Sequence, residues 1–193
     1  MPMQSAQKQS GRMLKRRSTY TCSMRVFIVS LFAFITSVII VYCSITFVAF
    51  PLKYRGEIEA AGAEFGVDPV LVASVIKTES RFRAGAVSPR GAVGLMQVMP
   101  STAEFVAEKY DLGEFDLYNP HDNIRIGTCY LRYLFDRFGD TRTVLAAYNA
   151  GPGNVARWAV DGRVETTPFP ETNKYVEKVL DARGYYRWRL KNV

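Results

Sequence analysis

A run of 27 residues without one charged side chain, residues 26–52, is the feature that most restricts how this chain can fold. About 20 apolar residues cross the hydrocarbon core of a bilayer as a helix. The apolar core of a cleavable signal peptide is shorter, about 7–15 residues, and ends at a small-x-small site. The stretch 47–50 (FVAF) is a poor site of that kind, and residues 26–50 have no polar face for a soluble core helix. The run therefore predicts a single transmembrane signal-anchor helix.

Basic residues are concentrated ahead of this run. Residues 1–25 hold six lysines and arginines and no acidic residue, whereas the chain after residue 52 has 19 basic and 18 acidic residues. We expect residues 1–25 to form a disordered basic tail on the cytoplasmic side of the cell (inner) membrane. Residues 53–193 then lie on the outer side, in a periplasm or a Gram-positive wall space. Their near-neutral charge argues against a nucleic-acid-binding domain.

Residues 53–193 have the length of one domain, and their apolar residues recur at helical spacing. No stretch of four to eight residues alternates convincingly between apolar and polar, so strands are expected to be minor. The pattern predicts an all-α or α-rich domain with a cleft. The expected helices cover residues 53–66, 69–79, 101–110 with a cap at Ser101 or Thr102, 120–138, 143–150, 154–159 and 171–183.

Cysteine and histidine usage argues against a disulfide or a metal site in this domain. Of Cys22, Cys43 and Cys129, only Cys129 lies in the domain, and the chain has no CxxC pair. The single histidine, His121, follows an Asn-Pro pair that begins a helix, and it is expected at the surface or near the cap. We therefore expect no metal and no cofactor.

Glu79 is the strongest candidate for chemistry. Asp68 and Pro69 are typical of a helix N-cap and first position, and Val75 and Ile76 belong to an apolar stripe that also contains Glu79. Burial and the negative end of the helix dipole both disfavour the charged carboxylate. A carboxyl that stays protonated near neutral pH suits a general acid. The alternative is that Glu79 turns from the helix end into water, since charged residues are seldom buried without a partner.

Four short motifs follow one another along the domain: ES at 79–80, SPRGAVGLMQVMP at 88–100, AYNAGPG at 147–153 and ETNKYVEKVL at 171–180. In order and spacing they resemble the lytic transglycosylase domain, over roughly residues 54–190. That family is similar in fold to goose-type lysozyme. The resemblance implies a lysozyme-like lytic transglycosylase domain preceded by the single transmembrane helix.

The resemblance also implies roles for individual residues. Glu79 matches the catalytic acid/base, and Asn173 stands where many members have arginine, a departure expected to change packing or a salt bridge rather than catalysis. The alternative of a structural role stays open for several substrate-binding candidates: the methionines are spaced as core residues, Tyr148 could be buried with one hydrogen bond, and Tyr175 lies on an amphipathic helix. The expected substrate-binding residues are Ser88, Gln97, Met99, Tyr148, Asn149 and Tyr175.

The implied activity is cleavage of the β-1,4 bond between N-acetylmuramic acid and N-acetylglucosamine in peptidoglycan glycan strands, leaving 1,6-anhydromuramic acid ends. Glu79 would protonate the leaving oxygen and then take the proton of the muramic C6 hydroxyl, so no second carboxylate is needed. Most glycosidases do use a second one, and Asp68, Asp122 and Glu171 are candidates, but each lies at an expected helix start, where capping explains it. Two alternatives remain: a hydrolytic muramidase of the same fold, and a non-catalytic wall-binding scaffold protein. The sequence names no protein partner.

Overall fold

The computed structural model describes residues 24–44 and 51–191 and divides the chain into two compact units, Met1–Ala49 and Phe50–Val193. Almost all of the expected basic tail, Cys22 included, lies outside the described residues. In the first unit, Met24–Ser44 forms one helix of 21 residues that is long and apolar enough to cross a membrane. At about 1.5 Å per residue it measures roughly 30 Å, the thickness of a bilayer's hydrocarbon core.

The polar side chains of this helix are compatible with an apolar surrounding. Thr36 and Ser37 donate their hydroxyl protons to backbone carbonyls three residues earlier, and Ser44 donates to the carbonyl of Ile40 at 2.8 Å. These hydroxyls are therefore satisfied within the helix, as a hydrocarbon environment requires.

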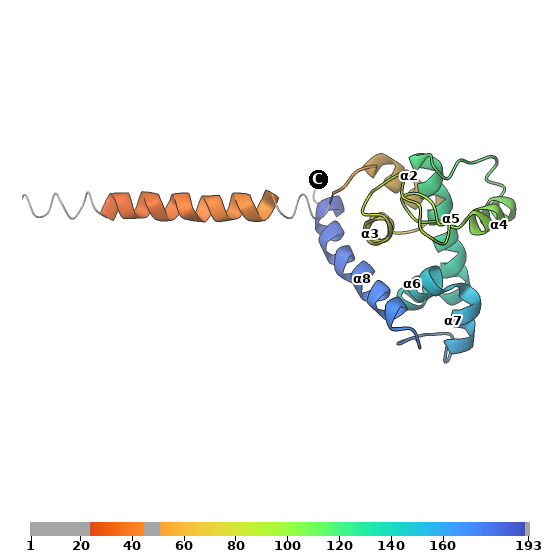
Figure 1. The fold of residues 1–193 in the computed structure, drawn as a ribbon. Helices are drawn as coiled ribbons and strands as arrows, with labels where there is room; N and C mark the ends of the chain where they lie inside the picture. Colours follow the sequence, from red (N-terminus) through yellow and green to blue (C-terminus); the bar gives the residue numbers. More distant parts are fainter. Residues whose placement is uncertain (1–23, 45–50, 192–193) are drawn as a thin grey trace, which may run out of the picture. The chain divides into compact units, whose positions relative to one another are not determined.

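The second unit is built from helices, as predicted (Figure 1). Among its described residues the only β-structure is three isolated bridges, Val87–Val93, Val93–Val98 and Val160–Arg163. The helices are α2 (Arg55–Phe65), α3 (Pro69–Glu79), α4 (Pro100–Tyr110), α5 (Pro120–Phe138), α6 (Thr141–Ala150), α7 (Pro152–Trp158) and α8 (Pro170–Lys191).

Side-chain capping explains three of the helix starts. The side chains of Asp68, Asn119 and Asp140 accept backbone N–H groups at the beginnings of α3, α5 and α6. The expected cap of α4 was wrong: Met99 occupies the N-cap position without a side-chain hydrogen bond, and Pro100 starts the helix. A proline at the first position has no N–H to satisfy, so this start needs no polar cap.

The last helix was predicted too short, because α8 continues beyond residue 183 to Lys191. Its extension is held by Tyr186, which is fully buried and donates its hydroxyl proton to the carbonyl of Pro51 at 2.8 Å. That contact joins positions 135 residues apart, so local sequence patterns could not reveal it.

Helix α3 lies in the middle of the unit (Figure 1). Every residue from Val70 to Ile76 is at most 3% exposed. Helix α3 packs against α2 and α8, while α5 packs against α2, α4 and α6, and α6 also contacts α7 and α8. The most deeply buried helix therefore carries Glu79 as its last residue.

Candidate active site

Glu79 ends α3 at the edge of the core, where it is partly buried. Burial raises its pKa from 4.5 to about 7, and the Tyr175 hydroxyl opposes this shift by favouring the charged form. The direction agrees with the prediction from helical periodicity. At neutral pH the carboxyl is close to half protonated, a state in which it can both donate and accept a proton.

Two phenols face Glu79, that of the partly buried Tyr148 on α6 and that of the buried Tyr175 on α8. Burial and the nearby Glu79 charge together hold the pKa values of Tyr148 and Tyr175 well above that of an ordinary phenol. The Tyr148 hydroxyl donates to the carbonyl of Met96 at 2.8 Å. The Tyr175 hydroxyl is buried without a hydrogen-bond partner of standard length, so its contact with Glu79 is a long one.

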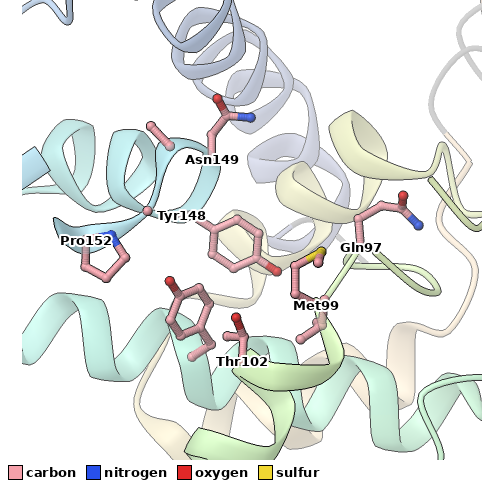
Figure 2. A pocket seen from close by; sticks show the side chains of 10 residues that line it. Gln97, Met99, Thr102, Tyr148, Asn149 and Pro152 are labelled. Carbon is pink, nitrogen blue, oxygen red and sulfur yellow. The ribbon is translucent and has the colours of Figure 1, made fainter. Parts of the chain in front are cut away.

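Two hollows adjoin these tyrosines, and Asn149 lines both. The first has a volume of about 290 Å³ and is lined by residues that include Met99 and Tyr148 (Figure 2). The second, about 310 Å³, is lined by Thr78, Asn149, Glu171, Lys174, Tyr175 and Lys178. Glu79 is not itself among the lining residues of either hollow. Each hollow is lined by one of the two tyrosines that face Glu79: Tyr148 lines the first and Tyr175 the second.

Asn149 connects α6 to α8. Its side chain extends from the end of α6 away from Tyr148 and Pro152 (Figure 2). Its side-chain amide oxygen accepts the Thr172 hydroxyl proton at 3.0 Å. Thr172 is 3% exposed, so this hydrogen bond fixes the side chain of Asn149 between the two hollows.

The loop that carries Gln97 and Met99 is held by Asn123, a residue that the sequence reasoning missed. Asn123 is 1% exposed, accepts the Met96 N–H at 2.8 Å, and donates to the carbonyls of Val93 and Leu117 at 2.9 Å each. A buried amide with three hydrogen bonds to backbone fixes a loop that has little regular structure of its own. Its only sequence signal is a polar residue on the buried side of α5.

Glycines on both sides of this loop make the close packing possible. A Cβ at Gly94, where φ is +79°, would lie 2.1 Å from the Asn123 amide nitrogen. A Cβ at Gly127 would lie 2.5 Å from the sulfur of Met96, which is fully buried. Larger residues at these two positions would push the loop away from α5.

The structure places Ser88 and Gln97 in hydrogen bonds within the loop. The Ser88 hydroxyl accepts the Ala92 N–H at 3.0 Å, and the Gln97 amide donates to the carbonyls of Ala86 and Gly94 at 3.0 and 2.9 Å. Gln97 lines the first hollow, but its amide points away from Tyr148 in Figure 2. Both side chains therefore stabilise the loop in this structure.

Sequence reasoning also missed two residues that line the first hollow. Tyr130, from the middle of α5, packs its ring 5.3 Å from that of Tyr148, and Thr102 comes from the first turn of α4. Tyr130 is 9% exposed and lies among the buried residues of α5. Nothing in the local pattern distinguishes a tyrosine that contacts a cavity from one that only packs.

The other candidate carboxylates have different surroundings. Asp68 caps α3 and pairs with Arg183 at 3.0 Å, while Asp122 accepts the Asp116 N–H at 3.0 Å. Glu171 is exposed in the first turn of α8, at the second hollow. No other described carboxylate shifts the pKa of Glu79.

Further predictions concern residues outside the site. His121 is exposed beside the α5 cap, Cys129 is buried, and Asn173 exchanges hydrogen bonds with the backbone of Thr167 at 2.8 and 2.9 Å. Asn173 thus holds the loop before α8, which is a packing role. Over residues 24–44 and 51–191, no group of three His, Cys, Asp or Glu side chains is arranged to hold a metal ion.

Comparison with known proteins places this geometry in a family. The family model described as Transglycosylase SLT domain matches residues 57–165, which is more than half of the chain. The chain belongs to the transglycosylase SLT domain family. The matched region includes Glu79, the loop pinned by Asn123, and the AYNAG segment with Tyr148 and Asn149.

Several relatives share this SLT domain. The soluble lytic murein transglycosylase of Escherichia coli (strain K12) is 37% identical over 152 residues, which are 72% of this chain and 24% of that protein. The membrane-bound lytic murein transglycosylase C of Actinobacillus pleuropneumoniae serotype 5b (strain L20) is 32% identical over 184 residues, 76% of this chain and 50% of the relative. The chain therefore spans about a quarter of the soluble relative and half of the membrane-bound one.

Solved structures agree in fold. The 70 kDa soluble lytic transglycosylase of Escherichia coli superposes with a TM-score of 0.68 at 35% identity, covering 74% of this chain and 25% of that one. An inactive mutant of the lytic transglycosylase Slt from Pseudomonas aeruginosa gives the same TM-score and identity over 73% of this chain and 25% of that one. The SLT, lysozyme-like α-helical fold predicted from the motifs is therefore confirmed.

Proposed function

We propose that this SLT-domain protein is a peptidoglycan lytic transglycosylase that cleaves the β-1,4 bond after N-acetylmuramic acid and leaves a 1,6-anhydro end. The observation that carries the proposal is a single partly buried carboxyl, Glu79, with a pKa of about 7, facing the phenols of Tyr148 and Tyr175 beside two hollows. Its relatives named lytic murein transglycosylases support the substrate class.

In the first step Glu79 acts as an acid. The bond between C1 of the muramic acid and the glycosidic oxygen breaks, its electron pair stays on that oxygen, and the Glu79 proton neutralises the oxygen. The positive charge on C1 is stabilised by the N-acetyl group of the substrate. A carboxyl that burial keeps about half protonated near pH 7 suits this step.

In the second step Glu79 acts as a base. The muramic C6 hydroxyl gives its proton to the Glu79 carboxylate, and a lone pair of that oxygen forms the new bond to C1. The carboxyl ends in the protonation state in which it began, and no water is consumed. A second carboxylate has no part in this sequence, in agreement with a Glu79 pKa that no other described carboxylate shifts.

We infer the binding roles from the same geometry. The exposed Met99 and the ring of Tyr148 form an apolar wall for a sugar face, and the Asn149 amide is held in place to donate to a sugar oxygen. The Tyr175 hydroxyl, which lacks a partner of standard length, is available to the reacting sugar. Ser88 and Gln97 hold the loop through the Ser88 hydroxyl oxygen and the Gln97 amide nitrogen. The groups that they contribute to sugar binding are the Ser88 hydroxyl proton and the Gln97 amide oxygen.

We also propose that the protein is anchored in the cell (inner) membrane. In this arrangement residues 1–25 are cytoplasmic, residues 26–52 form the signal anchor, and residues 53–193 form the catalytic domain on the outer side. The helix Met24–Ser44 and the relative named membrane-bound support the anchor. A tag inserted after Leu52 should be labelled by reagents added outside the cell. Labelling from the cytoplasmic side alone would reject the anchor's orientation.

The test of the activity is a digest of purified peptidoglycan analysed by mass spectrometry. Wild-type protein should release 1,6-anhydromuropeptides, and Glu79→Gln should lower their release by about 1,000-fold because it removes the acid and base. Asp68→Asn is the matched control, since it neutralises the carboxyl at the other end of α3. Products with reducing ends would identify a hydrolytic muramidase, and undiminished release by Glu79→Gln would reject the mechanism.

A further inference from the structure

The C-terminal end of α8 lies beside the start of the second unit (Figure 1). Tyr186 is fully buried there and donates its hydroxyl proton to the carbonyl of Pro51 at 2.8 Å. Pro51 belongs to the uncharged run that ends at Leu52. The end of α8 is therefore fastened to the point at which the chain leaves its apolar segment.

Chain length limits how far this point can lie from the apolar helix. Six residues separate Pro51 from Ser44, the last residue of the helix. Even fully extended, a connection of that length spans at most about 25 Å, and all six residues are uncharged. With the helix in a membrane, as proposed above, Pro51 and the Tyr186 bound to it lie near the membrane surface.

The exposed residues beyond Tyr186 match the chemistry of such a surface. Trp188 is 66% exposed, and Arg187 is exposed beside it. The three acidic residues of α8 all occur by position 181, and none follows to the end of the chain. Tryptophan is enriched at membrane interfaces, and guanidinium groups bind phosphate. This end of α8 thus combines an amphipathic ring with basic side chains, in a stretch of the helix that contains no acidic residue.

We propose that the C-terminal end of α8 docks on the headgroups of an anionic phospholipid bilayer, with Trp188 at the interface. This proposal rests on the membrane anchor of the proposed function. Tyr175 precedes Trp188 by 13 residues on the same helix, which corresponds to roughly 20 Å along its axis. Docking would therefore hold the cleft within that distance of the membrane, where it meets glycan close to the bilayer.

The experiment uses the full chain in vesicles and its two tryptophans. Trp158→Phe leaves Trp188 as the only tryptophan, and Trp188→Phe leaves Trp158, which belongs to α7. Helix α7 lies far from the C-terminal end of α8 (Figure 1). Vesicles of phosphatidylglycerol and phosphatidylcholine carry nitroxide-labelled lipid near the headgroup. Quenching of Trp188 should exceed that of Trp158 at least three-fold, and equal quenching would overturn the proposal.

Charge dependence provides the second measurement. Quenching of Trp188 should fall at least two-fold when the vesicles are pure phosphatidylcholine. It should fall by as much in the double variant Arg187→Gln/Arg189→Gln on the anionic vesicles. The matched control, Arg90→Gln/Arg157→Gln, removes two other positive charges, both exposed, and should leave the quenching unchanged. Quenching that is insensitive to both lipid charge and the Arg187/Arg189 pair would overturn docking on anionic headgroups.

Failure of docking can be distinguished from failure of the proposed function. Retention of the chain in vesicles washed with alkaline carbonate reports the anchor alone, and digestion of soluble glycan strands reports catalysis alone. A retained, active protein with equally quenched tryptophans would reject docking and leave the proposed function intact.

Discussion

The two ends of α3 each carry a carboxyl group, but in opposite surroundings. At the start, Asp68 accepts the Val70 N–H and pairs with Arg183 at 3.0 Å, in contact with water. At the end, Glu79 is partly buried, and it faces the phenols of Tyr148 and Tyr175. The helix dipole stabilises a negative charge at the first position and destabilises it at the second.

Within this one helix, the carboxyl at the start contributes to stability, and the carboxyl at the end is suited to catalysis. Asp68 accepts a backbone N–H and pairs with Arg183, so this group helps α3 to start and to hold α8. The surroundings of Glu79 favour the protonated form, which is useful to catalysis and unfavourable to folding above neutral pH. The cleft also keeps a buried Tyr175 hydroxyl without a standard partner, a second unfavourable feature at the same end.

The largest expected effect concerns stability at high pH. Glu79→Gln should stabilise the protein above pH 7, because the wild-type carboxyl must ionise in a partly desolvated site. The folded-state pKa of about 7 exceeds the ordinary value of 4.5, so the wild type loses stability relative to the variant as pH rises from 4.5 to 7. The difference should reach on the order of 3 kcal/mol.

Unfolding of the detergent-solubilised full chain at pH 4 and pH 8 measures this effect. The two proteins should differ little at pH 4 and by most of the expected amount at pH 8. A Glu79→Gln protein that is less stable than wild type at pH 8 would show that the carboxyl is not held in its protonated form by burial.

An intermediate effect is expected from Tyr175→Phe. Its hydroxyl lowers the pKa of Glu79, so removing it should raise that pKa above about 7 and move the alkaline fall of kcat/KM upward, by about one pH unit. Tyr148→Phe is the matched control, because the Tyr148 hydroxyl donates to the Met96 carbonyl and not to Glu79. A pH profile that moves equally in both variants would argue against the specific contact between Tyr175 and Glu79.

The same contrast explains what the sequence could predict. The cap at Asp68 and the burial of Glu79 were both predicted correctly, because they depend on residues within one helix. The position of Glu79 follows from helical spacing, and its proposed role follows from the four motifs. Local spacing and short motifs were therefore enough to find α3 and the residue on which the proposed mechanism depends.

Features that depend on distant contacts were missed. Asn123 holds the loop that carries Gln97 by accepting the N–H of Met96, 27 residues earlier in the chain. No helical or strand periodicity indicates such a hydrogen bond. The extra length of α8 depends on Tyr186 binding Pro51, and Tyr130 reaches the first hollow only once α5 and α6 have packed. Tertiary structure determines each of these features.

The smallest expected effect returns to the start of α3. Asp68→Ala should destabilise the protein by about 1–2 kcal/mol, because it removes the N-cap and the ion pair with Arg183, whereas Asp68→Asn keeps the cap and should cost less than about 1 kcal/mol. Both variants should keep the pH dependence of activity, since Asp68 does not shift the pKa of Glu79. Denaturant titration measures the two costs. If Asp68→Asn proved as costly as Asp68→Ala, charge pairing with Arg183, whose buried Nε has no partner, would outweigh capping at this end of the helix.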